Sequence, residues 1–149
     1  MRKKEIVLCL CLLSLVYGCD ALTGLIDIFQ PRRTTVSFVN NSDFAVEVTV
    51  FFDDQQDIPE DVLTATGTER QFTIDAGATM TFSEDCDNLQ AIIIDDADLR
   101  VIGGAGPQDS TDVLRDGDDF GCGDTIIFTF DHSEVIIDFN ITVTTRGGS

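Results

Sequence analysis

The run Phe44-Ala45-Val46-Glu47-Val48-Thr49-Val50-Phe51-Phe52 decides the fold that the sequence predicts. Its even-numbered positions are all Phe or Val, and Glu47 and Thr49 lie between them. Apolar residues at every second position give a strand one buried face and one wet face, as in antiparallel sheets. The run 34–39 before it is rich in β-branched residues, and Asn40-Asn41-Ser42-Asp43 between them is a turn sequence. We therefore expect the two strands to form a hairpin.

More strand patterns follow to the end of the chain. The apolar run 89–94 is expected to be a central strand buried on both faces, and turns are expected at 75–77, 95–96 and 131–133. Seven or eight strands with no long helix predict an all-β fold, an antiparallel β-sandwich of immunoglobulin-like architecture, with a small β-barrel as the alternative. The expected strands are 34–39, 44–52, 71–74, 78–83, 89–94, 99–102, 124–131 and 134–144.

Two polar stretches, 53–70 and 103–123, interrupt the strand pattern. Pro59-Glu60-Asp61 in the first stretch could open one helical turn, with Pro at its first position and acids near the positive end of the dipole. Long loops on a rigid scaffold often carry binding residues, so both stretches are candidate functional loops. A solvated connection is the alternative for each.

The N-terminus has the pattern of an export signal. Arg2, Lys3 and Lys4 precede an apolar run of twelve residues from Ile6 to Tyr17. A membrane-spanning helix needs about 20 apolar residues, which is more than this run supplies. The sequence therefore predicts a secretory signal.

The end of this signal, Leu15-Val16-Tyr17-Gly18-Cys19, resembles the lipobox of bacterial lipoproteins. Val16, Gly18 and Cys19 fit the motif, whereas Tyr17 stands where a small residue is usual. The resemblance implies cleavage after Gly18, a diacylglycerol on the Cys19 thiol, and a lipid-anchored protein of the bacterial cell envelope that faces the periplasm or the exterior. Two or more acyl chains make a stable anchor.

The expected organisation is then a signal at 1–18, a lipidated tether at 19–33 and a β-sandwich domain at 34–146. Within the tether, Leu22, Leu25, Ile26 and Phe29 form one helical apolar stripe, which either lies on the membrane or docks on the domain.

The exported chain is strongly acidic. Residues 1–18 hold three of the nine basic and one of the 27 acidic residues, so residues 19–149 hold six Arg and 26 acids, a formal charge of −20. Such a surface excludes nucleic acid as a partner. A surface rich in Asp and without Lys is also typical of adaptation to salty water, where screening relieves self-repulsion.

Cysteine usage points to one disulfide. Cys9 and Cys11 leave with the signal and Cys19 takes the lipid, so Cys86 and Cys122 remain. Two remaining thiols in an exported chain most simply form a disulfide bond.

Aspartates beside glycines form the candidate metal site. Hard oxygen ligands on glycine-rich loops suit Ca²⁺, although the spacing is not that of an EF-hand. Solvated acidic turns are the alternative, and Asp53, Asp54 and Asp57 form a second cluster. The candidate ligands are Asp112, Asp116, Asp118, Asp119 and Asp124.

The sequence contains no G-x-S-x-G, H-E-x-x-H or P-loop motif. His132 is the sole histidine of the chain and is expected in an exposed turn beside Ser133. We therefore expect a membrane-anchored envelope lipoprotein without enzymatic activity, which serves in interaction or structure and has an envelope protein as its partner. The alternatives are a lipoprotein that binds Ca²⁺ or a small ligand and, less favoured, a carboxylate-dependent hydrolase.

Overall fold

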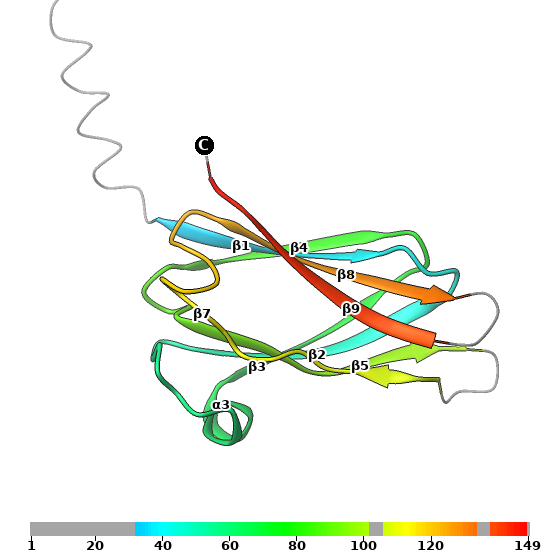
Figure 1. Cartoon of the computed structure of the whole chain (residues 1–149), viewed down its shortest axis with the longest axis horizontal. Coiled ribbons are helices and arrows are strands. Elements are labelled where there is room, and N and C mark those ends of the chain that lie inside the picture. The colour runs from blue at the N-terminus through cyan, green and yellow to red at the C-terminus, as the bar shows by residue number, and fades with distance from the viewer. Residues whose placement is uncertain (1–31, 102–105, 134–137, 149) are drawn as a thin grey trace, which may run out of the picture. The chain divides into compact units, whose positions relative to one another are not determined.

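Two β-sheets pack face to face around an apolar core, which confirms the predicted all-β sandwich; they do not close into a barrel (Figure 1). The computed structural model describes residues 32–101, 106–133 and 138–148. Arg32–Ser149 forms one compact unit, separate from Met1–Pro31. The predicted signal, the lipidation site Cys19 and the apolar stripe of the tether lie outside the described residues.

The first sheet has four strands in the order β4-β1-β8-β9. These strands are β1 (Arg33–Asn40), β4 (Thr79–Asp85), β8 (Thr125–Ser133) and β9 (Asp138–Arg146). The pairs β1–β4 and β8–β9 are antiparallel, which agrees with the predicted antiparallel sandwich, whereas β1 and β8 run parallel and depart from it. The first strand of the domain is thus held in the middle of this sheet.

The second sheet has five strands, in the order β3-β2-β5-β6, with β7 also paired to β5. The strands are β2 (Ala45–Asp53), β3 (Thr68–Ile74), β5 (Ala91–Arg100), β6 (Gln108–Asp109) and β7 (Leu114–Arg115). All pairs in this sheet are antiparallel. A tight turn with Gly77 at φ +68° follows β3 and leads the chain to β4, where the sequence predicted a turn.

Alternate residues of both sheets form the core. The predicted stripe of β2 is buried from Val46 to Phe52, and it faces Val36 and Phe38 of β1. Phe38 is central, because its ring lies 5.2–6.3 Å from four other phenylalanine rings. These rings belong to Phe72, Phe82, Phe128 and Phe130.

A short helix, α3 (Glu60–Thr66), covers part of the outer face of the second sheet (Figure 1). Leu63 is fully buried in a separate cluster with Ile58, Ala91 and Ile93. This cluster buries the outer face of β5 at Ala91 and Ile93, so the strand is buried on both faces from residue 91 to residue 94, as predicted for the run 89–94. The helix is longer than the single turn suggested by Pro59-Glu60-Asp61.

The predicted hairpin between the strands at 34–39 and 44–52 is wrong. The first strand pairs with β4 and β8, and the second pairs with β3 and β5 in the other sheet. Each strand has one apolar face, and those faces pack against each other across the core rather than side by side. The turn sequence 40–43 therefore connects the two layers.

The predicted turn at Asp95-Asp96 is wrong as well. β5 is one strand of ten residues, and the register with β2 shifts there, since Thr49 pairs with Asp96 but Val50 pairs with Ile94. Asp95 is the extra residue of a β-bulge. The bulge changes which positions point inward, so that Ile94 before it and Ala97 after it both reach the core.

Two more predictions need correction. His132 and Ser133 belong to β8 rather than to a turn, and the imidazole side chain of His132 is only 10% exposed, against the edge of the Phe44 ring. The stretch 103–123 is less irregular than predicted, because β6 and β7 lie along the edge of β5. Residues 134–137 of the last predicted strand lie outside the described part of the chain.

Candidate interaction surface

The two predicted functional loops lie against each other at one end of the sandwich. The side-chain amide of Gln56 donates a hydrogen bond of 2.5 Å to the carbonyl oxygen of Asp116. The guanidinium of Arg115 donates to the carbonyl oxygen of Ile58 at 2.9 Å and also to that of Gln56. These contacts join the segment after β2 to the turn after β7.

The turn after β7 is held in place by its own side chains. A carboxylate oxygen of Asp119 accepts a 2.8 Å hydrogen bond from the backbone N–H of Arg115. Phe120 at the end of the turn is only 5% exposed and belongs to the main core. The backbone N–H of Asp116 donates to the carbonyl oxygen of Gln90, directly before β5. The sandwich therefore fixes where this turn presents its carboxylates.

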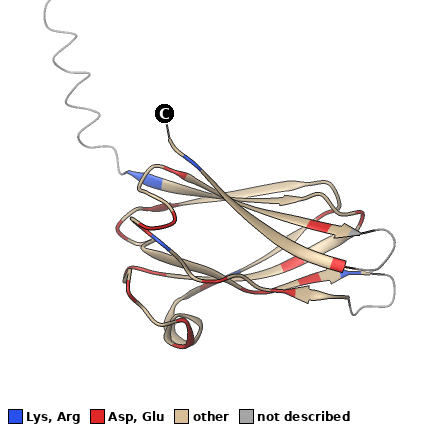
Figure 2. Cartoon of the chain, in the orientation of Figure 1, with Lys and Arg blue, Asp and Glu red and all other residues tan. Residues whose placement is uncertain are grey.

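The joined loops carry a dense negative charge, which Figure 2 shows in red. Arg115, the cation between them, directs its guanidinium to backbone carbonyls rather than to these carboxylates. We call the set of carboxylates on the two loops the acidic loop surface. It consists of Asp53, Asp54, Asp57, Asp116, Asp118 and Asp119.

The candidate calcium ligands hold the backbone of this region. Asp119 caps the turn described above, and Asp124 accepts hydrogen bonds from the backbone N–H groups of Gly121 at 2.7 Å and Gly148 at 3.2 Å. Asp112 is exposed on the segment before β7. In the described part of the chain, no three His, Cys, Asp or Glu side chains lie close enough together to hold a metal ion. Calcium binding by Asp112, Asp116, Asp118, Asp119 and Asp124 stays a prediction.

A polar groove of about 240 Å³ lies on the outer face of the second sheet. Burial raises the pKa of Asp96 above its ordinary value, and the neighbouring charges of Asp98 and Asp95 raise that pKa further. Glu47 on the same face forms an ion pair with Arg100. The groove is lined by Glu47, Val48, Thr49, Gln71, Phe72, Thr73, Asp96 and Asp98.

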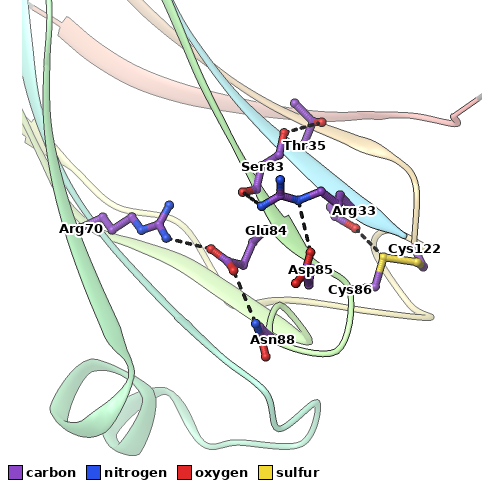
Figure 3. Close-up of polar contacts among 10 residues, drawn as sticks. Arg33, Thr35, Arg70, Ser83, Glu84, Asp85, Cys86, Asn88 and Cys122 are labelled. Atoms are coloured by element: carbon purple, nitrogen blue, oxygen red, sulfur yellow. Dashed lines mark hydrogen bonds and ion pairs between the residues drawn. A yellow bond between two sulfur atoms is a disulfide. The ribbon is translucent and has the colours of Figure 1, made fainter. Parts of the chain in front are cut away.

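A second groove, of about 380 Å³, lies where β3 and β4 form the edges of their sheets. Arg70 of β3 forms an ion pair with Glu84 of β4 (Figure 3), with 2.7 Å between nitrogen and oxygen. The Arg70 guanidinium also lies 5.0 Å from the ring centroid of Phe52 and 4.8 Å from that of Phe82. This contact closes one open side of the sandwich. No sequence pattern predicts this contact, because the pairing of Arg70 with Glu84 depends on the sheet order.

Cys86 and Cys122 form a disulfide bond, as predicted (Figure 3). Cys86 directly follows β4 and Cys122 shortly precedes β8, so the bond ties two ends of the first sheet. The Thr34 hydroxyl lies 3.6 Å from the Cys86 sulfur, and the backbone N–H of Cys86 donates to the carbonyl of Arg32 at 3.0 Å. The disulfide therefore lies beside the point where the chain enters the domain.

The chain matches no protein-family model, and neither a curated protein nor a solved structure is significantly similar to it. Within the described residues, no helix has both the length and the apolar character that a membrane crossing requires. The function must therefore be argued from the residues and their arrangement.

Proposed function

We propose that this protein is a lipid-anchored lipoprotein of the bacterial cell envelope with a non-catalytic role in interaction or structure. The observation that carries the proposal is the lipobox-like sequence ending at Gly18-Cys19, directly after a basic and apolar export signal. A disulfide in the domain supports an oxidising compartment, because such bonds are rare in the bacterial cytoplasm.

The architecture supports an interaction role. A rigid sandwich holds two loops from distant parts of the sequence in direct contact, through Gln56, Arg115 and Asp116. Loops fixed in this way present a surface with little entropy left to lose on binding. The partner that fits the acidic loop surface is an envelope protein with a basic patch, since complementary charge speeds the encounter and selects the partner.

The first test is recovery of partners from native membranes by the lipidated protein. A variant that neutralises the exposed acids of the loops, Asp54→Asn/Asp57→Asn/Asp118→Asn, should lose a partner that the unchanged protein recovers. The matched control makes the same change of charge elsewhere, as Asp43→Asn/Asp75→Asn/Asp138→Asn, and should retain the partner. Equal recovery by both variants would contradict the role of the acidic loop surface.

A further inference from the structure

The two outer faces of the sandwich differ sharply in charge. The register of the first sheet places eleven uncharged residues on the middle of its outer face, of which nine are Thr or Ser. We call this surface the neutral face. It consists of Thr35, Ser37, Val39, Thr79, Thr81, Ser83, Thr125, Ile127, Thr129, Thr142 and Thr144.

The outer face of the second sheet, in contrast, carries acids at outward-facing positions of its strands. Glu47, Glu69, Asp96 and Asp98 point outward from its strands, and α3 adds further acids beside them. Thr is a good strand former on any exposed face, so Thr alone would mean little. The contrast between the faces is informative because both belong to one domain with a large excess of acids.

Among the described residues on the outer face of the first sheet, charged residues lie only at the two ends of the neutral face. The end where the chain enters carries Arg146, which pairs with Thr125, and the Arg33–Asp85 ion pair at 3.2 Å. The other end carries Asp131 and Asp138. Figure 2 shows basic residues at the start of β1 and near the C-terminus, which lie at the same end.

The free positive charges of the domain gather at this entry end. Arg70 and Arg100 form ion pairs with glutamates, and Arg115 donates to carbonyl oxygens. Arg32 and Arg146 are exposed, and among the described residues neither has an ion-pair or side-chain hydrogen-bond partner. They come from opposite ends of the domain sequence, and the β1-β8-β9 ladder brings them to one end of the first sheet.

We propose that the neutral face, with Arg32 and Arg146 at its entry end, lies toward the anionic headgroups of the bilayer that anchors the protein. This inference rests on the proposed lipid anchor. The compact domain begins at Arg32, so the proposed anchor holds this end of the domain near the membrane. Thirteen residues, 19–31, span at most about 45 Å, so the whole domain remains within reach of the bilayer.

Repulsion and attraction act in the same direction here. The negative surface potential of an anionic leaflet repels the acidic second sheet, and it attracts Arg32 and Arg146. Each arginine close to such a leaflet contributes about fivefold to partitioning. The field decays over a Debye length of about 8 Å at physiological salt. Only charges on the side of the domain that faces the leaflet therefore contribute strongly to its attraction or repulsion.

The acidic loop surface lies at this same end of the domain, because the Thr145 hydroxyl, next to Arg146, donates a 3.0 Å hydrogen bond to the carbonyl oxygen of Asp119. Asp85 is paired with Arg33, and both oxygens of the Asp124 carboxylate accept backbone hydrogen bonds. Asp87 is exposed close by, and together with the acidic loop surface it opposes the attraction of the arginines. The absence of charge on the neutral face is therefore what favours its approach to the leaflet. Turned this way, the domain presents its acidic second sheet away from the bilayer.

The experiment imposes the anchor and measures the orientation. Residues 20–149, which include the compact unit with its own core and disulfide, carry an N-terminal histidine tag bound to vesicles with nickel-chelating lipid. One exposed thiol is added for a fluorescent donor, as Thr144→Cys on the neutral face or Gln71→Cys on the second sheet. Energy transfer to a headgroup acceptor is then compared between 30% phosphatidylglycerol and pure phosphatidylcholine.

On anionic vesicles, we expect transfer from position 144 to exceed transfer from position 71 at least twofold, and the difference to shrink on neutral vesicles or in 0.5 M NaCl. Arg146→Gln should reduce the difference, and Arg32→Gln/Arg146→Gln should reduce it further, whereas the charge-matched Arg100→Gln should not. Equal transfer from both positions on anionic vesicles would overturn the inference, as would indifference to the Arg146 change. Because the tag replaces the lipid, this result is independent of whether Cys19 is acylated, which mass spectrometry of the native chain decides.

Discussion

The side-chain amide of Asn40 donates a 3.0 Å hydrogen bond to the carbonyl oxygen of Ile74, and so joins the last residue of β1 in one sheet to the last residue of β3 in the other. The same amide donates to the carbonyl oxygens of Phe44 at 2.8 Å and Asp75 at 3.1 Å. Its oxygen accepts from the Ser42 backbone and hydroxyl. One buried side chain thus holds the crossing between the two layers.

Replacement of Asn40 by Ala should therefore be strongly destabilising. It leaves the carbonyl of Ile74 and the backbone N–H of Ser42 without these partners, and unsatisfied buried polar groups cost about 1–3 kcal/mol each. We expect the free energy of unfolding to fall by about 3 kcal/mol in urea denaturation. Asn41→Ala, which removes an exposed bond to Asp131, should cost less than about 1 kcal/mol. Equal losses for both variants would contradict this role of Asn40.

The Cys86–Cys122 disulfide should contribute strongly to stability. It closes a loop with a sequence separation of 36 residues, for which the chain-entropy model gives about 4 kcal/mol. The variant Cys86→Ala/Cys122→Ala should fold with a correspondingly lower free energy of unfolding. Adding a reductant should lower the melting temperature of the unchanged protein and leave that of the variant unaffected. A shift of the same size in both would show that the effect of the reductant does not come from this bond.

Phe128 fills the centre of the core beside Phe38, at 5.7 Å between ring centroids. Phe128→Ala should lower the free energy of unfolding by about 3–5 kcal/mol, because it opens a cavity that the two sheets cannot close. The neighbour Ile127 lies on the neutral face, so Ile127→Ala is the matched control and should cost clearly less. Chemical denaturation of both variants checks the assignment of inner and outer faces, and a larger cost at Ile127 would reverse it.

Asp96 gives a pH-dependent prediction. Burial first, and then the charges of Asp98 and Asp95, raise its pKa above the ordinary 3.8. The native state therefore binds this proton more tightly than the unfolded chain, so the contribution of Asp96 to stability falls as the pH rises through the window from 3.8 to the raised pKa. Asp96→Asn should melt at a higher temperature than the unchanged protein at pH 7, and this advantage should vanish below the ordinary pKa of Asp96.

The exposed Asp54→Asn serves as the control for this pH series. It removes one negative charge outside the groove of the second sheet, and so reports the general effect of a lower net charge. A pH profile for Asp96→Asn that coincides with that of Asp54→Asn would contradict the local cause. A lower melting temperature of Asp96→Asn at pH 7 would do so as well.

Local sequence patterns predicted where most of the long strands lie, but they did not predict which strands pair with each other. The alternation around Val48 located β2, and the continuous apolar run around Ile92 correctly indicated burial on both faces. The pairing of β1 depends on which faces meet across the core, and no short window of sequence contains that information. The bulge at Asp95 was predicted to be a turn because two adjacent aspartates are typical turn residues.

The disulfide could be predicted from the sequence, whereas the contact between the loops and the neutral face could not. The disulfide was predictable because removing the cysteines of the predicted signal and the predicted anchor leaves a single pair, Cys86 and Cys122. The contact between the two acidic loops depends on Arg115 and Gln56, whose backbone partners lie far away in the sequence. The neutral face could not be predicted from the sequence either, because its residues come from four strands whose order only the structure provides.

The measurement that tests the account most directly is the intact mass of the protein purified from its native membrane, together with that of a Cys19→Ala variant. We predict that the native chain begins at Cys19 and carries a diacylglycerol on that residue, and that the variant is neither acylated nor cleaved after Gly18 while its β-sandwich still folds. A native chain that keeps residues 1–18 or carries no lipid would contradict the account, as would a variant acylated to the same extent.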